Sequence, residues 1–217
     1  INMPVDKTGE HLEAFRQTGK PLVLIDRKIQ GLACDSILVD NRNAAYQAIR
    51  HMTELGHREI GLVVGPQHIY AARERKAGYE QALREAGIPL REEYIWYGTD
   101  DMNSGVDGIR SLRTQNPRMT GAFVANHAMT MGAVIGLNEL GIQLGREFSL
   151  VGFDNRQFAR ACNPRLTIVA QPTDRIAQHA AGMMLERLAG TDGQPRTVET
   201  LQTEILPGKS VRNLKSC

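Results

Sequence analysis

Polar residues directly follow several short apolar runs of this sequence, at the points where those runs end. Three polar pairs are placed in this way, Asp26-Arg27, Asn126-His127 and Asp154-Asn155, and Arg75 lies in the first turn of the helix predicted after Gly65-Pro66. An arginine can donate two parallel hydrogen bonds to vicinal hydroxyls or to a carboxylate, and an aspartate can accept from two hydroxyls. These residue types suit a small polar ligand that is held by many hydrogen bonds.

The same residues also have ordinary structural interpretations. An aspartate after a strand is often a helix cap or a turn former, and Arg75 could be as solvated as its neighbours Arg73 and Lys76. His57, next to Gly56, fits a partner of a helix C-terminal dipole better than a ligand-binding group. Position alone therefore leaves both interpretations open.

The chain carries none of the compact signatures of catalysis or cofactor binding. It contains no GxGxxG or GxxxxGK[ST] loop, no HExxH helix, and no serine or cysteine on a nucleophile elbow. The six histidines include no pair at ligand spacing on one predicted element, and the three cysteines have no metal-ligand spacing. We therefore expect no catalytic residue, no metal and no cofactor.

The clearest structural unit lies at residues 55–66. Gly56 follows an amphipathic helical pattern over 44–55, in the position of a C-capping glycine. Residues 60–64 are apolar without alternation, as in a parallel strand that is covered on both faces, and Gly65-Pro66 ends that strand. A helix then follows, and ligands of parallel sheets bind at the carboxyl ends of such strands.

Strands and helices alternate along the rest of the chain. We predict helices at 9–18, 44–55, 73–86, 105–114, 128–140 and 175–188, and strands at 22–25, 36–39, 60–64, 94–97, 122–125, 148–152, 166–170 and 198–206. The predicted N-caps are Asp40 or Asn41, Asn103 or Ser104, and Asp174. Because helices separate successive strands, we predict an α/β fold with mostly parallel, doubly wound sheets.

The composition limits the partners of the chain. Of its 217 residues 41% are hydrophobic, and 26 Lys and Arg residues against 24 Asp and Glu residues leave a formal charge of +2. The basic residues are interleaved with acidic ones, so no patch favours nucleic acid. Three cysteines, Cys34, Cys162 and Cys217, suit free thiols in a reducing compartment. No apolar run reaches a membrane span and no signal peptide is present, so we expect a cytoplasmic protein with no membrane partner.

Several phrases occur in a characteristic order along the chain. They include Pro21-Leu22-Val23-Leu24-Ile25-Asp26-Arg27, Val39-Asp40-Asn41, Leu55-Gly56-His57-Arg58, Glu74-Arg75-Lys76-Ala77-Gly78-Tyr79, Ala125-Asn126-His127-Ala128-Met129, Ser149-Leu150-Val151-Gly152-Phe153-Asp154 and Leu166-Thr167-Ile168. Together they resemble the effector-binding region of the lactose-repressor (LacI/GalR) family of bacterial transcription regulators. The resemblance runs from about Lys20 to Leu206, which is most of the chain.

This resemblance implies two similar α/β subdomains of the periplasmic-binding-protein-like type I fold, joined by three crossovers, with the effector in the cleft between them. On this basis, residues 1–40 and 170–200 form an incomplete amino-side subdomain, and residues 41–169 and 201–217 form the carboxyl-side subdomain. The resemblance also implies a homodimer and operator DNA, bound through a helix-turn-helix head that this chain lacks.

The resemblance assigns ligand-binding roles to particular residues. Arg75 matches the arginine that grips the effector, and Asn126 and Asp154 match polar contacts at two strand ends. Asp26, followed by Arg27, and Gln171 match cleft positions from the amino-side subdomain. Two residues of the expected rim depart from the family pattern: His127 stands where an acid is usual, and Asp100 stands where many members place an aromatic ring.

These two departures bear on the ligand. The missing ring removes a stacking platform for a sugar face, and His127 makes the rim less negative, which suits a sugar acid or a sugar phosphate beside Arg75. Asp100 acts in the opposite direction if it points inward. We therefore expect a small sugar-like effector, with a sugar acid or a sugar phosphate as the anionic alternative. We also expect Arg75→Ala to abolish the effector response and to leave the fold intact.

Two other functions are compatible with these residues. A periplasmic sugar-binding protein of a transporter shares the fold and the cleft, although the phrase at residues 55–58 and the cysteines favour the regulator. An α/β enzyme acting on a sugar could use Asp154 and His127 as an acid–base pair, but the chain lacks a recognisable nucleophile, metal site or phosphate loop. We therefore expect a regulator that is not an enzyme.

Overall fold

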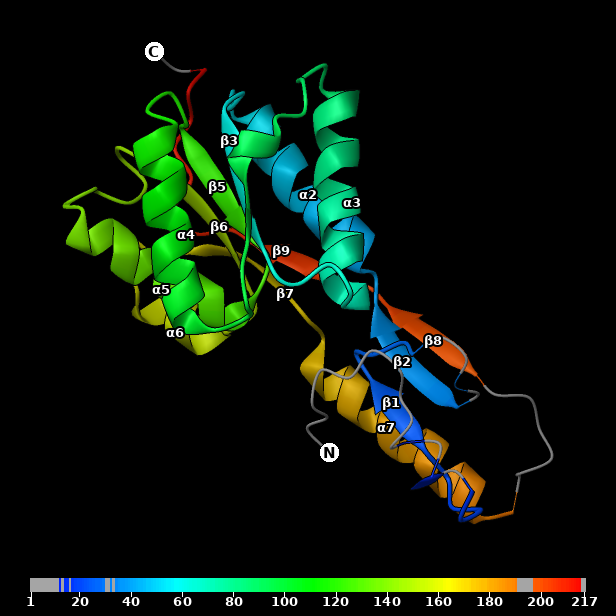
Figure 1. Cartoon of the computed structure of the whole chain (residues 1–217). Helices are drawn as coiled ribbons and strands as arrows, with labels where there is room; N and C mark the ends of the chain where they lie inside the picture. The colour runs from blue at the N-terminus through cyan, green and yellow to red at the C-terminus, as the bar shows by residue number, and fades with distance from the viewer. Residues whose placement is uncertain are drawn as a thin grey trace.

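The computed structural model describes residues 12, 14, 15, 17–29, 32, 34–190 and 197–215. These residues form two sheets (Figure 1). The larger has the order β4-β3-β5-β6-β7-β9 and the smaller the order β1-β2-β8. The strands are β1 (Val23–Ile25), β2 (Asp35–Val39), β3 (Ile60–Val64), β4 (Ile95–Tyr97), β5 (Gly121–Val124), β6 (Ser149–Phe153), β7 (Thr167–Ala170), β8 (Val198–Leu201) and β9 (Glu204–Leu206).

Helices cover both faces of the larger sheet. They are α2 (Asn41–Glu54), α3 (Tyr70–Glu85), α4 (Met102–Gln115), α5 (His127–Glu139) and α6 (Arg156–Ala161), while α7 (Thr173–Leu188) packs on the smaller sheet. Helices α2 and α3 lie on one face of the larger sheet, and α4, α5 and α6 lie on the other (Figure 1). Neighbouring strands of the described chain run parallel except for β7 and β9. The α/β, doubly wound prediction is confirmed.

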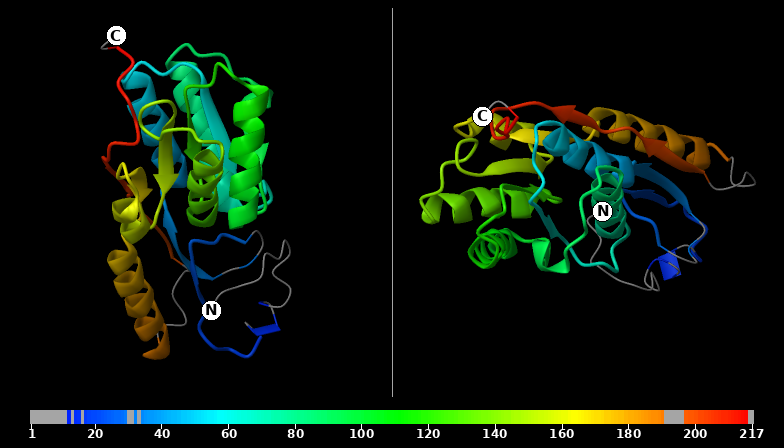
Figure 2. Two further views of the ribbon diagram at one scale, coloured as in Figure 1. Left: turned by 90° about the vertical axis from the view of Figure 1, so that its left-hand side faces the viewer. Right: turned by 90° about the horizontal axis from the view of Figure 1, so that it is seen from above.

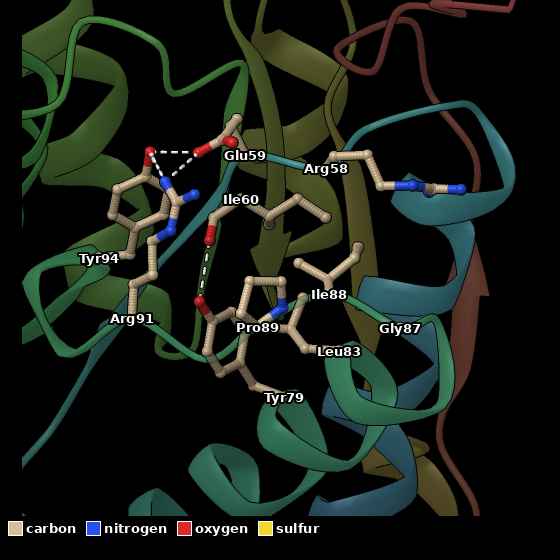
Figure 3. A pocket seen from close by; sticks show the side chains of 10 residues that line it. All are labelled: Arg58, Glu59, Ile60, Tyr79, Leu83, Gly87, Ile88, Pro89, Arg91 and Tyr94. Carbon is tan, nitrogen blue, oxygen red and sulfur yellow. Dashed lines mark hydrogen bonds and ion pairs between the residues drawn. The ribbon is translucent and has the colours of Figure 1, made fainter.

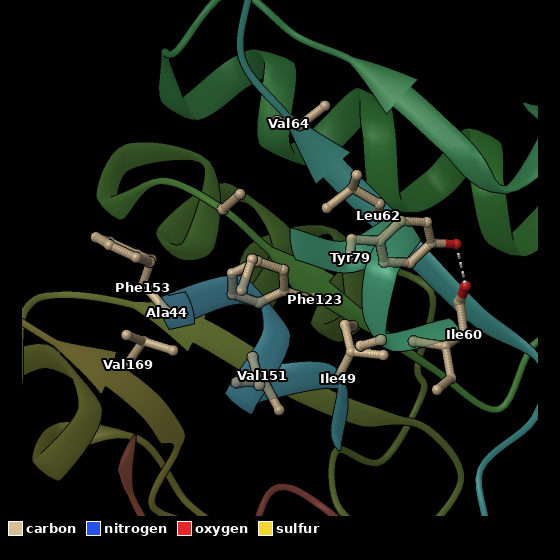
Figure 4. Packing of buried hydrophobic residues seen from close by; sticks show 14 of the residues in the cluster. Ala44, Ile49, Ile60, Leu62, Val64, Tyr79, Phe123, Val151, Phe153 and Val169 are labelled. Atoms are coloured by element: carbon tan, nitrogen blue, oxygen red, sulfur yellow. Dashed lines mark hydrogen bonds between the residues drawn. The ribbon is translucent and has the colours of Figure 1, made fainter. Parts of the chain in front are cut away.

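The alternation of side chains along β3 divides the core into two layers. Successive residues of a strand point to opposite faces, so Ile60, Leu62 and Val64 pack under α2 and α3, as Figure 4 shows. Val63 faces the other way and joins the cluster beneath α4 and α5. All five residues of β3 are buried, so the prediction of a doubly covered strand is confirmed with its boundaries.

The described chain passes between the two sheets three times, after β2, after β7 and after β8 (Figure 2). The single strand predicted at 198–206 is therefore wrong, because β8 belongs to the smaller sheet and β9 to the larger. An alternating pattern shows one covered face but does not show which sheet covers it. The helix predicted at 9–18 and the thiol of Cys217 fall largely or wholly outside the described residues.

Several predicted helix starts need correction. Asp40 caps α2 as expected, and its carboxylate accepts from the backbone N–H of Asn43. The cap of α4 is Asp101 rather than Asn103 or Ser104. Asp174 lies inside the first turn of α7 instead of at its N-cap. Helix α6 was not predicted at all, because six residues are too few to show a helical period.

His57 is a core residue rather than a dipole partner. It follows Gly56, which has the left-handed φ of 92° expected of a helix-ending glycine. The His57 ring is fully buried and lies 2.8 Å from the Thr120 hydroxyl and 3.1 Å from the Arg212 carbonyl oxygen. Burial lowers its pKa. His57 thus joins the carboxyl-terminal segment to the sheet as a neutral ring, which corrects the expectation of a charge at the helix end.

Among the described residues, no helix combines the length and apolar character needed to cross a membrane.

Candidate functional site

The candidate site is built around Arg75, which lies in the second turn of α3. Its side chain is buried, with 7% of the residue exposed. The guanidinium Nε donates to the Asn41 side-chain oxygen at 2.7 Å, and Nη1 donates to the Ala125 carbonyl oxygen at 2.6 Å. Its flat face lies 3.6 Å from the centroid of the Phe153 ring. Arg75 is therefore a fixed charge in the interior rather than a solvated helix residue.

Three aspartates surround this arginine. Asp26 follows β1 of the smaller sheet, and its Oδ2 lies 3.9 Å from Arg75 Nη2. Burial lowers the pKa of Arg75, while the charges of Asp26, Asp154 and Asp100 oppose that shift. Each aspartate comes shortly after the carboxyl end of a different strand, as expected for ligand-binding positions of a parallel sheet. The cluster thus joins the larger sheet to the smaller one.

Asp100 points toward the cluster. Its Oδ1 accepts a hydrogen bond of 3.0 Å from the side-chain amide of Asn126. It also packs so closely on Gly65 that a Cβ there would meet Asp100 Oδ1 at 2.1 Å. Burial raises the pKa of Asp100, and the charges of Arg75 and Arg27 oppose the rise. Gly65 is therefore required for this carboxylate to occupy its place.

Asp154 connects the end of β6 to the segment that leads into α7. Its Oδ1 accepts from the backbone N–H of Gln171 at 3.1 Å, and its second oxygen accepts from the Gln171 side-chain amide. Gln171 lies directly after β7, where the chain leaves the larger sheet. This pair therefore anchors one of the three passages between the sheets.

The backbone at these aspartates is unusual. Asp26, Asp100 and Asp154 have φ values of 53°, 66° and 58°. The left-handed region costs an L-residue about 1–2 kcal/mol, and residues held there cluster at functional sites. Within the described chain, the only other non-glycine residue with positive φ is Asn155, next to Asp154. The residues with an unfavourable, left-handed backbone conformation thus lie around Arg75.

The carboxylate of Asp26 has one buried and one more accessible side. Its Oδ1 is buried without a hydrogen-bond partner. Burial is the largest cause that raises the pKa of Asp26, against the charge of Arg75 and the nearby side chain of Asn41, which both lower it. A buried acceptor without a donor costs about 1–3 kcal/mol. The rest of the carboxylate is accessible, because 33% of the Asp26 side chain is exposed, and there it can accept from a bound hydroxyl or amine.

The other residues predicted to bind the ligand differ in how they contact the Arg75 cluster. Arg27 is half-buried, and its charge acts on both Asp26 and Asp100. Asn126 takes both of its possible roles, because its oxygen caps α5 through the Met129 N–H while its amide binds Asp100. His127 begins α5 and is exposed.

Sequence reasoning missed two parts of the site. Asn41 was considered only as a helix cap, yet its side-chain oxygen holds Arg75. Phe153, the last residue of β6, forms the floor beneath the guanidinium. An asparagine at a helix start and a phenylalanine at a strand end are too ordinary to be recognised from the sequence alone.

A separate cavity of about 110 Å³ lies at the opposite, amino end of β3 (Figure 3). Here Tyr79 donates to the Ile60 carbonyl oxygen at 2.8 Å, and Arg91 donates to the Glu59 carboxylate at 2.8 Å. Its polar side chains are therefore already paired within the protein. No group of His, Cys, Asp and Glu side chains suited to a metal ion occurs within the described part of the chain.

Parallel sheets linked by three passages, with a polar cluster that draws on both, define a ligand-binding domain of the periplasmic-binding-protein type. A model of the periplasmic binding protein-like domain matches residues 49–211. The chain belongs to this family, and within it to the effector-binding region of the LacI-type regulators.

Individual relatives support the same assignment. The HTH-type transcriptional repressor PurR of Yersinia pestis is 35% identical over 189 residues, which cover 87% of this chain and 55% of that protein. A proposed ribose operon repressor from Burkholderia thailandensis is 31% identical, with a TM-score of 0.82 over 94% of this chain and 74% of that one. The regulator CelR in complex with cellobiose is 25% identical, with a TM-score of 0.83 over 93% and 69%. The chain thus spans about half the length of the curated relatives it matches.

Proposed function

We propose that this chain is the effector-sensing domain of a transcriptional repressor. A small sugar-like molecule binds at the Arg75 cluster and controls operator binding by a homodimer. The DNA is contacted through a helix-turn-helix head outside this chain. The observation that carries the proposal is the buried Arg75, which donates hydrogen bonds to Asn41 and Ala125. Three aspartates whose backbone lies in the left-handed region surround it.

Sugars fit the hydrogen-bonding capacity of this cluster. Arg75 retains N–H groups beyond the two bonds to protein, and the partly exposed carboxylate of Asp26 can accept hydrogen bonds. A hydroxyl both donates and accepts, so a polyhydroxyl ligand can satisfy both kinds of group. One relative is described as a proposed ribose operon repressor and another as a complex with cellobiose, which supports a sugar here. Sugar acids and sugar phosphates are the anionic members of the same class.

Control of DNA binding follows from population shift. We divide the chain into an amino-side subdomain at residues 1–40 and 170–200, and a carboxyl-side subdomain at 41–169 and 201–217. Asp26 and Gln171 belong to the first subdomain, and Arg75, Asn126 and Asp154 to the second. A ligand that contacts both groups of residues binds the closed arrangement more tightly and increases its population. A two-fold dimer then matches two operator half-sites.

A thermal-shift screen with ribose, other uncharged sugars, sugar acids and sugar phosphates tests this function. A ligand that binds the folded chain raises its melting temperature. Asp154→Asn keeps the shape of the side chain but loses one acceptor, so we expect the shift to disappear. Asp174→Asn, an exposed change on α7, is the matched control and retains the shift.

Three results would contradict the proposal. The first is that no sugar of any class shifts the melting temperature. The second is turnover of a bound sugar, which would indicate the enzyme. The third is a gene whose upstream coding sequence specifies a signal peptide in place of a helix-turn-helix, which would indicate the periplasmic transporter component, localised outside the cytoplasm.

A further inference from the structure

Asp100 is the site residue whose chemistry narrows the ligand class. It is half-buried, accepts from Asn126 at 3.0 Å, and packs on Gly65, which has no side chain to keep it out. These contacts fix the carboxylate close to the binding groups. The charge of Arg75 acts on it directly.

The charges around Arg75 do not balance. The charges that act most strongly on Arg75 among the described residues are the carboxylates of Asp26, Asp100 and Asp154 and the guanidinium of Arg27. Within this group of five side chains, carboxylates therefore outnumber guanidiniums. Arg75 also has fewer N–H groups left for an anion, because two of its nitrogens already donate to Asn41 and Ala125.

Such a site is unfavourable for an anion. A phosphate or carboxylate group brings acceptors, and the three aspartates around Arg75 are acceptors as well. Like charges placed together in a partly buried site repel strongly, and specificity often depends on such repulsion. An uncharged sugar instead brings hydroxyl donors for the carboxylates and lone pairs for the arginine.

We propose that Asp100 is a specificity-determining residue that makes this site select uncharged, hydroxyl-rich ligands and reject sugar acids and sugar phosphates. This inference rests on the proposed function, because it concerns the same site. It assigns the rejection of anionic sugars to the Asp100 carboxylate, so removing that one charge should weaken the preference for uncharged sugars.

The test compares Asp100→Asn with wild type. Asparagine keeps an oxygen that can accept from Asn126 and removes the charge. Asp101→Asn is the matched control, because it makes the same change one residue away at the exposed cap of α4, where asparagine caps equally well. Calorimetry at low ionic strength measures the dissociation constants of ribose, glucose, glucuronate and ribose 5-phosphate for all three proteins.

We expect wild type and Asp101→Asn to bind one of the uncharged sugars and to bind its anionic counterpart at least tenfold more weakly. Asp100→Asn should reduce the ratio of the two dissociation constants by about tenfold, because the anion binds more tightly once the charge is removed. This effect should be smaller at high salt. Equal or tighter binding of the anion by wild type would overturn the inference while the proposed function stands. An unchanged preference in Asp100→Asn would also overturn it. A sugar found only in the thermal-shift screen takes the place of ribose or glucose in this comparison. Failure of every sugar in that screen to bind would instead overturn the proposed function.

Discussion

Arg75→Ala tests whether the site arginine is also a structural residue. The substitution removes the donors of two buried hydrogen bonds, to the Asn41 side chain and to the Ala125 carbonyl oxygen. It also removes the cation that faces Asp26, and it opens a space above Phe153. Removing one partner of a buried charged group costs about 3–5 kcal/mol, and each orphaned acceptor costs about 1–3 kcal/mol, which partly overlaps with that figure.

We therefore expect Arg75→Ala to lower the free energy of unfolding by about 3–5 kcal/mol. The sequence-based expectation was an intact fold, because it gave Arg75 a role in ligand binding alone. Urea unfolding followed by circular dichroism measures the change. Arg73→Ala, on the exposed side of the same helix, is the control and should change the free energy by less than about 0.5 kcal/mol. A loss below about 1 kcal/mol for Arg75→Ala would refute the structural role.

Three further predictions concern packing and pH. Gly132→Ala should destabilise the protein, because its Cβ would lie 1.9 Å from the Met102 carbonyl oxygen. Gly182→Ala in α7 meets open space, so it should leave the free energy of unfolding unchanged or raise it by up to about 1 kcal/mol. Thermal unfolding of the two variants makes the comparison. Because the folded-state pKa of His57 lies below 6.5, its contribution to stability is present above 6.5 and is lost as the pH falls. The unfolding free energy of wild type should therefore decrease more steeply toward acid than that of His57→Gln, and equal slopes would contradict this. Sugar affinity should fall as the pH is lowered toward about 4, because sugar hydroxyls donate to ionised aspartates. Burial raises the pKa of such an aspartate, for example Asp26, so it becomes protonated more readily. A dissociation constant that does not change with pH would count against the role of these carboxylates.

The sequence predicts the strand and helix order well, because each unit carries its own signal. The strand at 60–64 has unbroken apolar character and a glycine-proline stop, and its boundaries are confirmed. The partition into two sheets is not local information. The segment at 198–206 shows one alternating pattern, yet a break of two residues sends β8 and β9 to different sheets.

The candidate site is predictable to the level of residue types at strand ends. The rule for parallel sheets places Asp26, Asn126 and Asp154 at such ends, and the structure brings them together around Arg75. Burial of that arginine could not be read from neighbours that are themselves charged. Nor could the inward direction of Asp100, because it depends on a left-handed backbone and on the space beside Gly65.

The most direct test of the central claim is to map where a sugar binds. Backbone amide shifts of the ¹⁵N-labelled chain, recorded as an uncharged sugar is titrated, report the contact site residue by residue. We expect the largest changes at Asp26, Asp100, Asn126 and Asp154. Changes confined to the opposite end of β3, around the Glu59 cavity, would contradict it.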